Sequence, residues 1–139
     1  MANIAFDHDG TITEDPQAFF LMAALFKARG HKIYIVTMRY ASEGDFDPIW
    51  KDVVEDIIFT GRQSKRSAVA SRGIEIHIWI DDNPKTVDHN AIDVWGWASK
   101  EGDIIVENHG SNKPSSALIT ESVYQMKDFH IRVANGNHE

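Results

Sequence analysis

The sequence predicts an α/β fold, a three-layer sandwich in which an open parallel sheet carries helices on both faces. One observation predicts this fold class, and two more bound the number of domains and the chemistry that stabilises them. Short apolar runs alternate with segments of helical apolar spacing, which is typical of successive β–α–β units. The chain has 139 residues, so we expect residues 1–139 to form a single domain. It contains no cysteine, and therefore neither disulfides nor thiolate metal sites support the fold.

The expected strands are short, apolar and rich in β-branched or aromatic residues. In chain order they are Ile4–Phe6, Lys32–Thr37, Ile57–Phe59, Glu75–Ile80 and a stretch around Ile92–Trp95. The third is brief enough to be buried on both faces, as strands of parallel sheets are.

The expected helices begin at capping signals, which are a polar cap residue or a proline in the first turn. In chain order they are a helix from Asp15-Pro16 to Gly30, one opened by Asp47-Pro48, one from Ser64 to Ser71, and a short one from Pro84. Further along, Ile119, Val123 and Met126 have helical spacing and predict a C-terminal helix after a polar loop.

The net charge of the chain indicates which classes of binding partner are favoured. Lys and Arg number 14 against 21 Asp and Glu, a formal net charge of −7, which disfavours polynucleotides and anionic membranes without excluding nucleic acid. No apolar run approaches the roughly 20 residues of a membrane span, and the first residues lack a secretion signal. We therefore expect a cytoplasmic protein. The sequence does not fix its oligomeric state.

Polar side chains follow the expected strands at the edge where ligands bind in open α/β sheets. They are Asp7 and Asp9 after the first strand, Thr37 and Arg39 after the second, Lys65 after the third, and Asp81 and Asp82 after the fourth. Four carboxylates at one edge repel one another, and an all-oxygen set of this kind suits Mg²⁺. Lys65 can neutralise a phosphoryl group, and an Asp carboxylate can attack phosphorus. Together with Arg62 and Arg66, Arg39 and Lys65 could also guide an anionic substrate inward.

Four short motifs resemble those of the haloacid dehalogenase (HAD) superfamily of phosphohydrolases. Phe6 to Ile12 is similar to its first motif, Asp-x-Asp-Gly-Thr/Val, and Ile35 to Thr37 to its second, a strand that ends in Ser or Thr. Lys65 resembles the lysine of the third motif, and Ile78 to Asp82 resembles the acidic fourth motif. The ordered set spans about Asn3 to Trp97.

The resemblance implies a Rossmann-like fold and a Mg²⁺-dependent phosphatase that hydrolyses a phosphomonoester. Asp7 would be the nucleophile, Asp9 the general acid and base, and Thr37 and Lys65 would hold the phosphoryl oxygens. Mg²⁺ would bind the Asp7 side chain, the Asp9 backbone carbonyl and the Asp81–Asp82 pair. Which of Asp81 and Asp82 ligates directly stays open.

Four further residues are candidates for contact with the substrate. Gly10 and Thr11 complete the first motif, and Arg39 follows the second. His8 stands where the family commonly has an apolar residue, so it is a departure from the pattern. The alternative for Arg39 is a surface ion pair, and the alternative for His8 is a position without a functional role.

The segments after the first and third expected strands leave no room for the cap domains of the family. The resemblance therefore implies a capless member with an open site that accepts bulky phosphorylated substrates. Substrate identity is not readable from the sequence. Two alternatives stay open: a phosphotransferase with the same residues, and a non-catalytic module that binds Mg²⁺ or phosphate.

Overall fold

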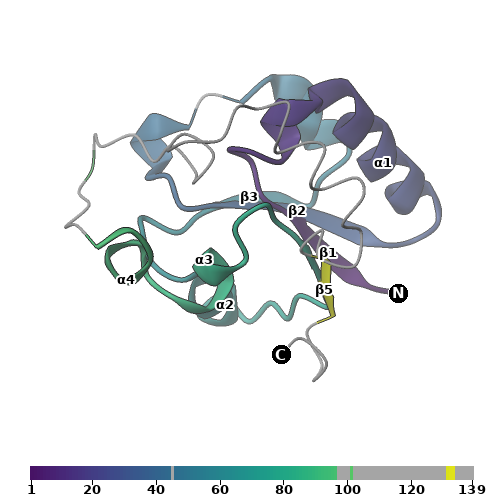
Figure 1. Ribbon diagram of the computed structural model, residues 1–139. Coiled ribbons are helices and arrows are strands. Elements are labelled where there is room, and N and C mark those ends of the chain that lie inside the picture. Colours follow the sequence, from purple (N-terminus) through teal and green to yellow (C-terminus); the bar gives the residue numbers. More distant parts are fainter. Residues whose placement is uncertain (45, 97–100, 102–130, 134–139) are drawn as a thin grey trace.

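The fold is a small α/β arrangement built on a five-stranded sheet, in which four neighbouring strands are parallel to one another. The structure is a computed structural model that describes residues 1–44, 46–96, 101 and 131–133. The sheet order is β3-β2-β1-β4-β5 (Figure 1). The strands are β1 (Asn3–Phe6), β2 (Lys32–Thr37), β3 (Asp56–Phe59), β4 (Ile78–Ile80) and β5 (Ile131–Val133). β5 pairs antiparallel with β4, and the other neighbours are parallel.

β1 lies at the centre of the parallel strands and aligns their carboxyl ends. Phe6 is in register with Ile35 of β2 and with Ile80 of β4. The residues that follow these three strands therefore emerge at one edge of the sheet. This register places Asp7 beside Asp81 across a strand pair.

One face of the sheet packs against α1 (Pro16–Ala28) and the short 3₁₀ turns η1 (Ile12–Glu14) and η3 (Pro48–Asp52). Ile4 and Phe6 point to this side, as the two-residue period of a strand requires. The Asp15 carboxylate caps α1 by accepting a hydrogen bond of 3.1 Å from the Ala18 N–H. The predicted first helix and its capping signal are confirmed.

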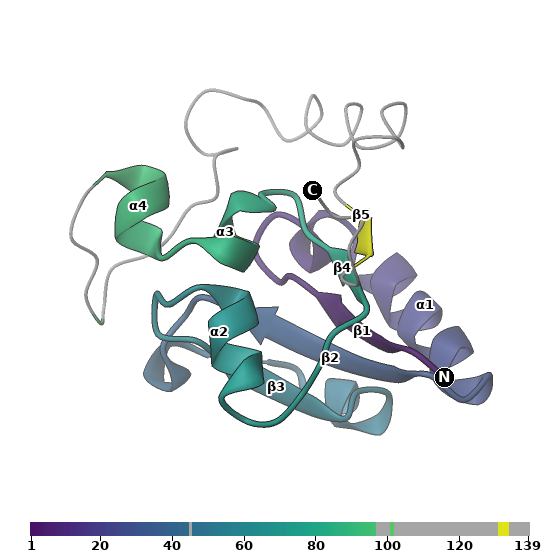
Figure 2. The ribbon, with the colours of Figure 1, turned by 90° about the horizontal axis from the view of Figure 1, so that it is seen from below.

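The opposite face packs against α2 (Lys65–Ala70) and α3 (Lys85–Asp88), and α4 (Ala91–Trp95) follows α3 (Figure 2). Ala5 and Trp79 point to this side, where they are buried in one apolar cluster with residues of α2 and α3. Ser64 caps α2, as predicted, by accepting from the Ser67 N–H at 3.3 Å.

The predicted fifth strand is wrong, because Ile92–Trp95 lies in α4. Ala91 is buried against Met38, and Gly96 ends the helix with a φ of +74°, which is the left-handed conformation that glycine tolerates. The place beside β4 belongs instead to β5, so the sheet is not wholly parallel. A five-residue segment with β-branched side chains gives too little pattern to separate helix from strand.

Three smaller expectations also differ from the structure. The helix predicted after Asp47-Pro48 is the 3₁₀ turn η3, and the fourth strand is limited to Ile78–Ile80. The third strand is an edge strand, so Asp56 is exposed and only Ile58 is fully buried. The predicted loop over 108–116 and the C-terminal helix over 119–126 lie outside the described residues.

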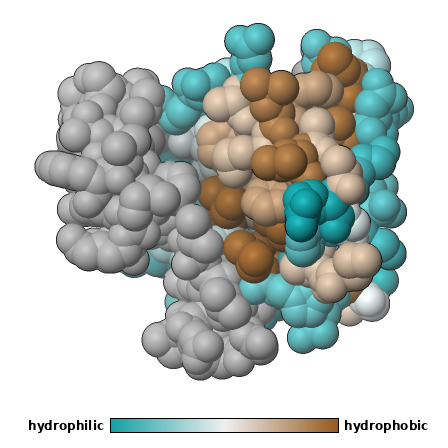
Figure 3. Space-filling view, turned by 90° about the vertical axis from the view of Figure 1, so that its right-hand side faces the viewer, coloured by the Kyte–Doolittle hydropathy of each residue, from teal (hydrophilic) through white to brown (hydrophobic). Residues whose placement is uncertain are grey.

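α1 is apolar on its outer side as well as its inner one. Leu21 and Leu25 are each 61% exposed, one turn apart. Figure 3, which views the right-hand side of Figure 1, shows apolar side chains gathered on this side. None of the helices within the described ranges combines the length and apolar character needed to cross a lipid bilayer.

Candidate active site

Three carboxylates and one ammonium group meet at the carboxyl edge of the sheet. Asp7 follows β1, Asp81 and Asp82 follow β4, and Lys65 is the first residue of α2. All four side chains are buried, with exposed fractions of 6% or less. One oxygen from each of the three carboxylates lies within 4.8 Å of the others.

Lys65 bridges two of these carboxylates. Its Nζ lies 2.7 Å from Asp7 Oδ1 and 2.6 Å from Asp81 Oδ2. A buried ammonium group needs such partners, because burial removes its hydration. The bridge fixes α2 against both β1 and β4.

Thr11 links the other side of Asp7 to Asp82. Its Oγ1 lies 3.2 Å from Asp7 Oδ2 and 3.2 Å from Asp82 Oδ1, and it accepts from the Asp82 N–H at 3.1 Å. A hydroxyl carries one proton, so Thr11 donates to only one of these carboxylates at a time.

Both oxygens of Asp81 are held by neighbouring donors. Oδ1 accepts from the Asn83 N–H at 2.9 Å, and Oδ2 accepts from Lys65 and from Thr86 Oγ1 at 3.3 Å. The sequence reasoning missed Asn83 and Thr86. The Asn83-Pro84 turn was visible as a helix start, but nothing in the pattern showed that its donors face Asp81.

Gly10 lets the loop after β1 approach Asp82. Its φ is +89°, and a Cβ at this position would lie 2.4 Å from Asp82 Oδ2. Only glycine meets both requirements without displacement. Gly10 therefore shapes the carboxylate cluster rather than merely following it in sequence.

Asp9 and Arg39 form a separate pair next to this cluster. Arg39 Nε lies 2.8 Å from Asp9 Oδ2 and Nη2 lies 2.7 Å from Asp9 Oδ1, which is the two-pronged geometry of strong guanidinium–carboxylate pairs. Burial alone would raise the pKa of Asp9. The hydrogen bonds from Arg39, together with the nearby His8 ring, outweigh burial and hold this pKa well below its usual range.

His8 and Thr37 lie with this second group. His8 Nδ1 is 3.5 Å from Asp9 Oδ1, and its ring packs edge-on against Phe46 with centroids 4.4 Å apart. Thr37 is buried at the end of β2, and its hydroxyl accepts from the Arg39 N–H at 3.3 Å. These contacts divide the expected site residues into two adjoining groups.

The first group holds more negative charge than its own donors neutralise. Three carboxylates and one ammonium group leave two negative charges when all are ionised. Burial, and then the neighbouring carboxylate of Asp82, raise the pKa of Asp7 to about 7 against the opposing pull of Lys65. Burial and the charge of Asp7 likewise raise the pKa of Asp81 to about 7. Protons or a cation must complete the cluster, and carboxylate oxygens suit Mg²⁺.

Two of the cations that were expected to guide a substrate, Arg62 and Arg66, are paired with carboxylates. Arg62 is buried and pairs with Glu43 at 2.9 Å and 3.0 Å, and Arg66 pairs with Asp88 at 2.7 Å. Arg62 also donates to the Met38 carbonyl oxygen at 3.1 Å. Glu43 was not identified from the sequence. It holds the loop after β2 in two ways: its carboxylate pairs with Arg62, and its backbone carbonyl oxygen accepts from Arg39 Nη1 at 2.9 Å.

The chain was compared with protein-family models, curated proteins and solved structures, and none of them matches it.

Proposed function

We propose that the protein is a Mg²⁺-dependent phosphatase of the HAD type, which hydrolyses a phosphomonoester through a phospho-aspartate at Asp7. The observation that carries the proposal is the buried network in which Lys65 bridges Asp7 and Asp81 beside Asp82. A structural network has no need to bury three carboxylates around one ammonium group at the ligand-binding edge of a sheet.

In the first step an Asp7 carboxylate oxygen attacks phosphorus and the ester P–O bond breaks. Asp9, as the carboxylic acid, gives a proton to the leaving oxygen. In the second step water attacks the phospho-aspartate, Asp9 takes the proton of this water, and Asp7 is released with inorganic phosphate. In this mechanism Lys65 and Thr37 hold the phosphoryl oxygens.

The carboxylate oxygens of the cluster fit Mg²⁺, and their contacts assign different roles to Asp81 and Asp82. Asp81 accepts from three donors, Lys65, Thr86 and the Asn83 N–H, so its role is to hold Lys65. Asp7 Oδ2 and Asp82 Oδ1, by contrast, share the single hydroxyl proton of Thr11. Asp7 and Asp82 are then the carboxylates that hold the metal, together with the Asp9 backbone carbonyl. When bound, Mg²⁺ supplies the positive charge that keeps Asp7 ionised and withdraws charge from the phosphoryl group.

The same proposal includes the fold family and the absence of a cap domain. We take the chain as a Rossmann-like, three-layer HAD domain without a cap. Only the turn η1 stands between β1 and α1, and only residues 60–64 separate β3 from α2. Neither segment can hold a further domain, which leaves an open edge suited to bulky phosphorylated substrates.

The proposal is tested by hydrolysis of 4-nitrophenyl phosphate with Mg²⁺ and with a chelator, in the wild type and in Asp7→Asn. We expect Mg²⁺-dependent turnover that Asp7→Asn abolishes. Asp93→Asn, which alters an exposed aspartate on α4, is the matched control and should retain turnover. Undiminished turnover in Asp7→Asn would refute the nucleophile.

One observation favours a second candidate, a non-catalytic module that binds Mg²⁺ or phosphate. The paired Arg39 keeps Asp9 ionised, whereas the proton donor of the first step must be protonated. For catalysis, Arg39 must release Asp9 when the substrate binds. Calorimetric Mg²⁺ binding that Asp82→Asn removes, without turnover of any of a panel of phosphomonoesters, would favour this candidate.

A further inference from the structure

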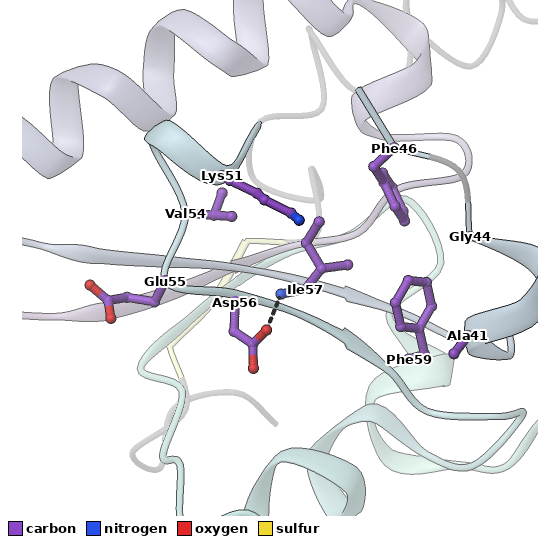
Figure 4. Close-up of a pocket in the computed structure, with 9 residues that line it drawn as sticks. All are labelled: Ala41, Gly44, Phe46, Lys51, Val54, Glu55, Asp56, Ile57 and Phe59. Carbon is purple, nitrogen blue, oxygen red and sulfur yellow. Dashed lines mark hydrogen bonds between the residues drawn. The ribbon is translucent and has the colours of Figure 1, made fainter. Parts of the chain in front are cut away.

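A pocket of about 600 Å³ lies beside the edge strand β3, away from the carboxylate cluster. This volume falls within the roughly 300–1,000 Å³ of small-molecule sites. Figure 4 shows its nine lining residues, which come from the 3₁₀ turn η2 (Ala41–Glu43) and the loop after it, from η3, from the segment between η3 and β3, and from β3. The phosphatase mechanism uses none of them.

The pocket has aromatic and aliphatic walls. Ile57 and Phe59 point from β3 into it, and Phe46 faces Phe59 with ring centroids 5.8 Å apart (Figure 4). Gly44 lets the Phe59 ring lie against the loop backbone, since a Cβ there would be 2.2 Å from the ring. Two rings inclined at 50° offer faces and edges to a further flat apolar group.

One charged group points over these walls. Figure 4 shows the ammonium group of Lys51 above Ile57, whereas the carboxylates of Glu55 and Asp56 point away from it. Asp56 already accepts from the Ile57 N–H at 2.8 Å and lies 3.7 Å from Arg72 Nη1. Among the ion pairs of the described residues, none includes Lys51.

We propose that this pocket binds a small amphipathic anion, a flat aromatic group between Phe46, Phe59 and Ile57 whose carboxylate or phosphate pairs with Lys51. The apolar wall of this pocket, together with the ammonium group above it, selects such ligands, because the ring is removed from water while the charge is neutralised. This site is additional to the proposed phosphatase centre and does not depend on its activity.

The pocket shares one wall with the loop of the candidate active site. Phe46 packs against His8 on one side and faces Phe59 on the other. A ligand that moves the Phe46 ring therefore changes the surroundings of His8. We expect its effects to reach the loop that carries Asp9.

The test uses 2-naphthoate, which has the ring and the charge, and 2-naphthalenemethanol, which has the ring alone. Titration of ¹⁵N-labelled protein should shift the amide signals of Gly44, Phe46, Ile57 and Phe59, with naphthoate binding the tighter. Lys51→Gln should weaken naphthoate about tenfold, the loss expected when a charged partner is removed, and leave the alcohol unchanged. Lys51→Arg should restore binding.

Two controls separate this site from other surfaces. Lys85→Gln, at an exposed lysine of α3, should leave naphthoate binding unchanged. The double variant Leu21→Gln/Leu25→Gln removes the exposed apolar side of α1 and should also leave it unchanged. The proposal is overturned if the shifts map to α1, or if Lys51→Gln binds naphthoate as well as the wild type. Repeating the titration with Asp7→Asn keeps its outcome separate from that of the phosphatase proposal.

Discussion

The close approach of Gly10 to Asp82 can be tested with a pair of glycines. Gly10 and Gly73 both have a positive φ, +89° and +75°, but a Cβ meets Asp82 only at Gly10. The backbone strain of Gly73→Ala should cost about 1 kcal/mol of unfolding free energy, and Gly10→Ala should cost about 2 kcal/mol more because Asp82 must move. Urea unfolding measures both. Equal losses would show that the contact with Asp82 contributes nothing.

Arg39 sets the charge state of Asp9, so its removal should move one pKa in a known direction. In Arg39→Met both hydrogen bonds from Arg39 to the Asp9 carboxylate disappear, while burial, which raises the pKa, and His8, which lowers it, remain. The pKa of Asp9 should therefore rise towards its ordinary value of 3.8. Carboxyl ¹³C titration by NMR measures this change. Arg66→Met, which breaks the exposed pair with Asp88, should leave Asp9 unaffected.

For individual residues, the sequence pattern predicted the carboxylates of the site but not their hydrogen-bond partners. Asp7, Lys65, Asp81 and Asp82 were found because each follows a strand that the hydrophobic pattern marks. Pairings such as Arg39 with Asp9, or Thr86 with Asp81, depend on side-chain directions across a loop or turn. No spacing rule encodes those directions.

Among the elements, the loop after β2 depends on the ion pair between the half-buried Glu43 and the buried Arg62. Arg62 has a φ of +71°, unusual for a residue with a side chain, and its guanidinium lies 5.0 Å from the Tyr40 ring centre. Glu43→Gln keeps the size of the side chain but removes the charge opposite Arg62. We expect a loss of about 3 kcal/mol in unfolding free energy, since breaking a buried pair leaves a buried charge.

The matched control for this loop is Glu75→Gln, an exposed glutamate that should change stability by less than about 0.5 kcal/mol. Urea unfolding of both variants decides the question. A loss in Glu43→Gln no larger than in Glu75→Gln would mean that the pair does not hold the loop.

Elements with long patterns or clear caps were predictable, and short ones were not. α1 has 13 residues, a capping aspartate and a first-turn proline, so its bounds were evident. α4 has five residues, and the buried contact of Ala91 with Met38 fixes it as a helix. The position of β5 beside β4 is a long-range pairing that no local pattern reveals.

At the scale of the whole molecule, the sheet pairs strands that are far apart in the sequence. This pairing also brings together the charged residues of the site. β1 brings Asp7 to β4, whose Asp81 and Asp82 lie more than seventy positions further along the chain. Alternating strands and helices predicted that such residues share an edge, and the register of β1 with β2 and β4 agrees with this. The raised pKa values are a consequence of burial, which only the packed structure supplies.

The raised pKa values predict how stability depends on pH when the metal is removed. Asp7 and Asp81 have a pKa of about 7 in the folded protein against 3.8 ordinarily, so between these values the folded state binds more protons than the unfolded chain. This contribution to stability is complete below pH 3.8 and is lost as the pH rises through about 7. Asp9 has the opposite sign, because its lowered pKa stabilises the fold above pH 3.8 and this is lost on acidification.

In a chelator, the urea unfolding free energy should therefore be lower at about pH 8 than at about pH 5, where Asp9 stays ionised. Asp81→Asn imitates the neutral acid at one of the two sites and should reduce the difference. Added Mg²⁺ should restore stability mainly at the higher pH, because it binds the ionised carboxylates and competes with protons for them. Equal unfolding free energies at the two pH values, or a restoration by Mg²⁺ that is larger at pH 5, would contradict the charge balance assigned to the cluster.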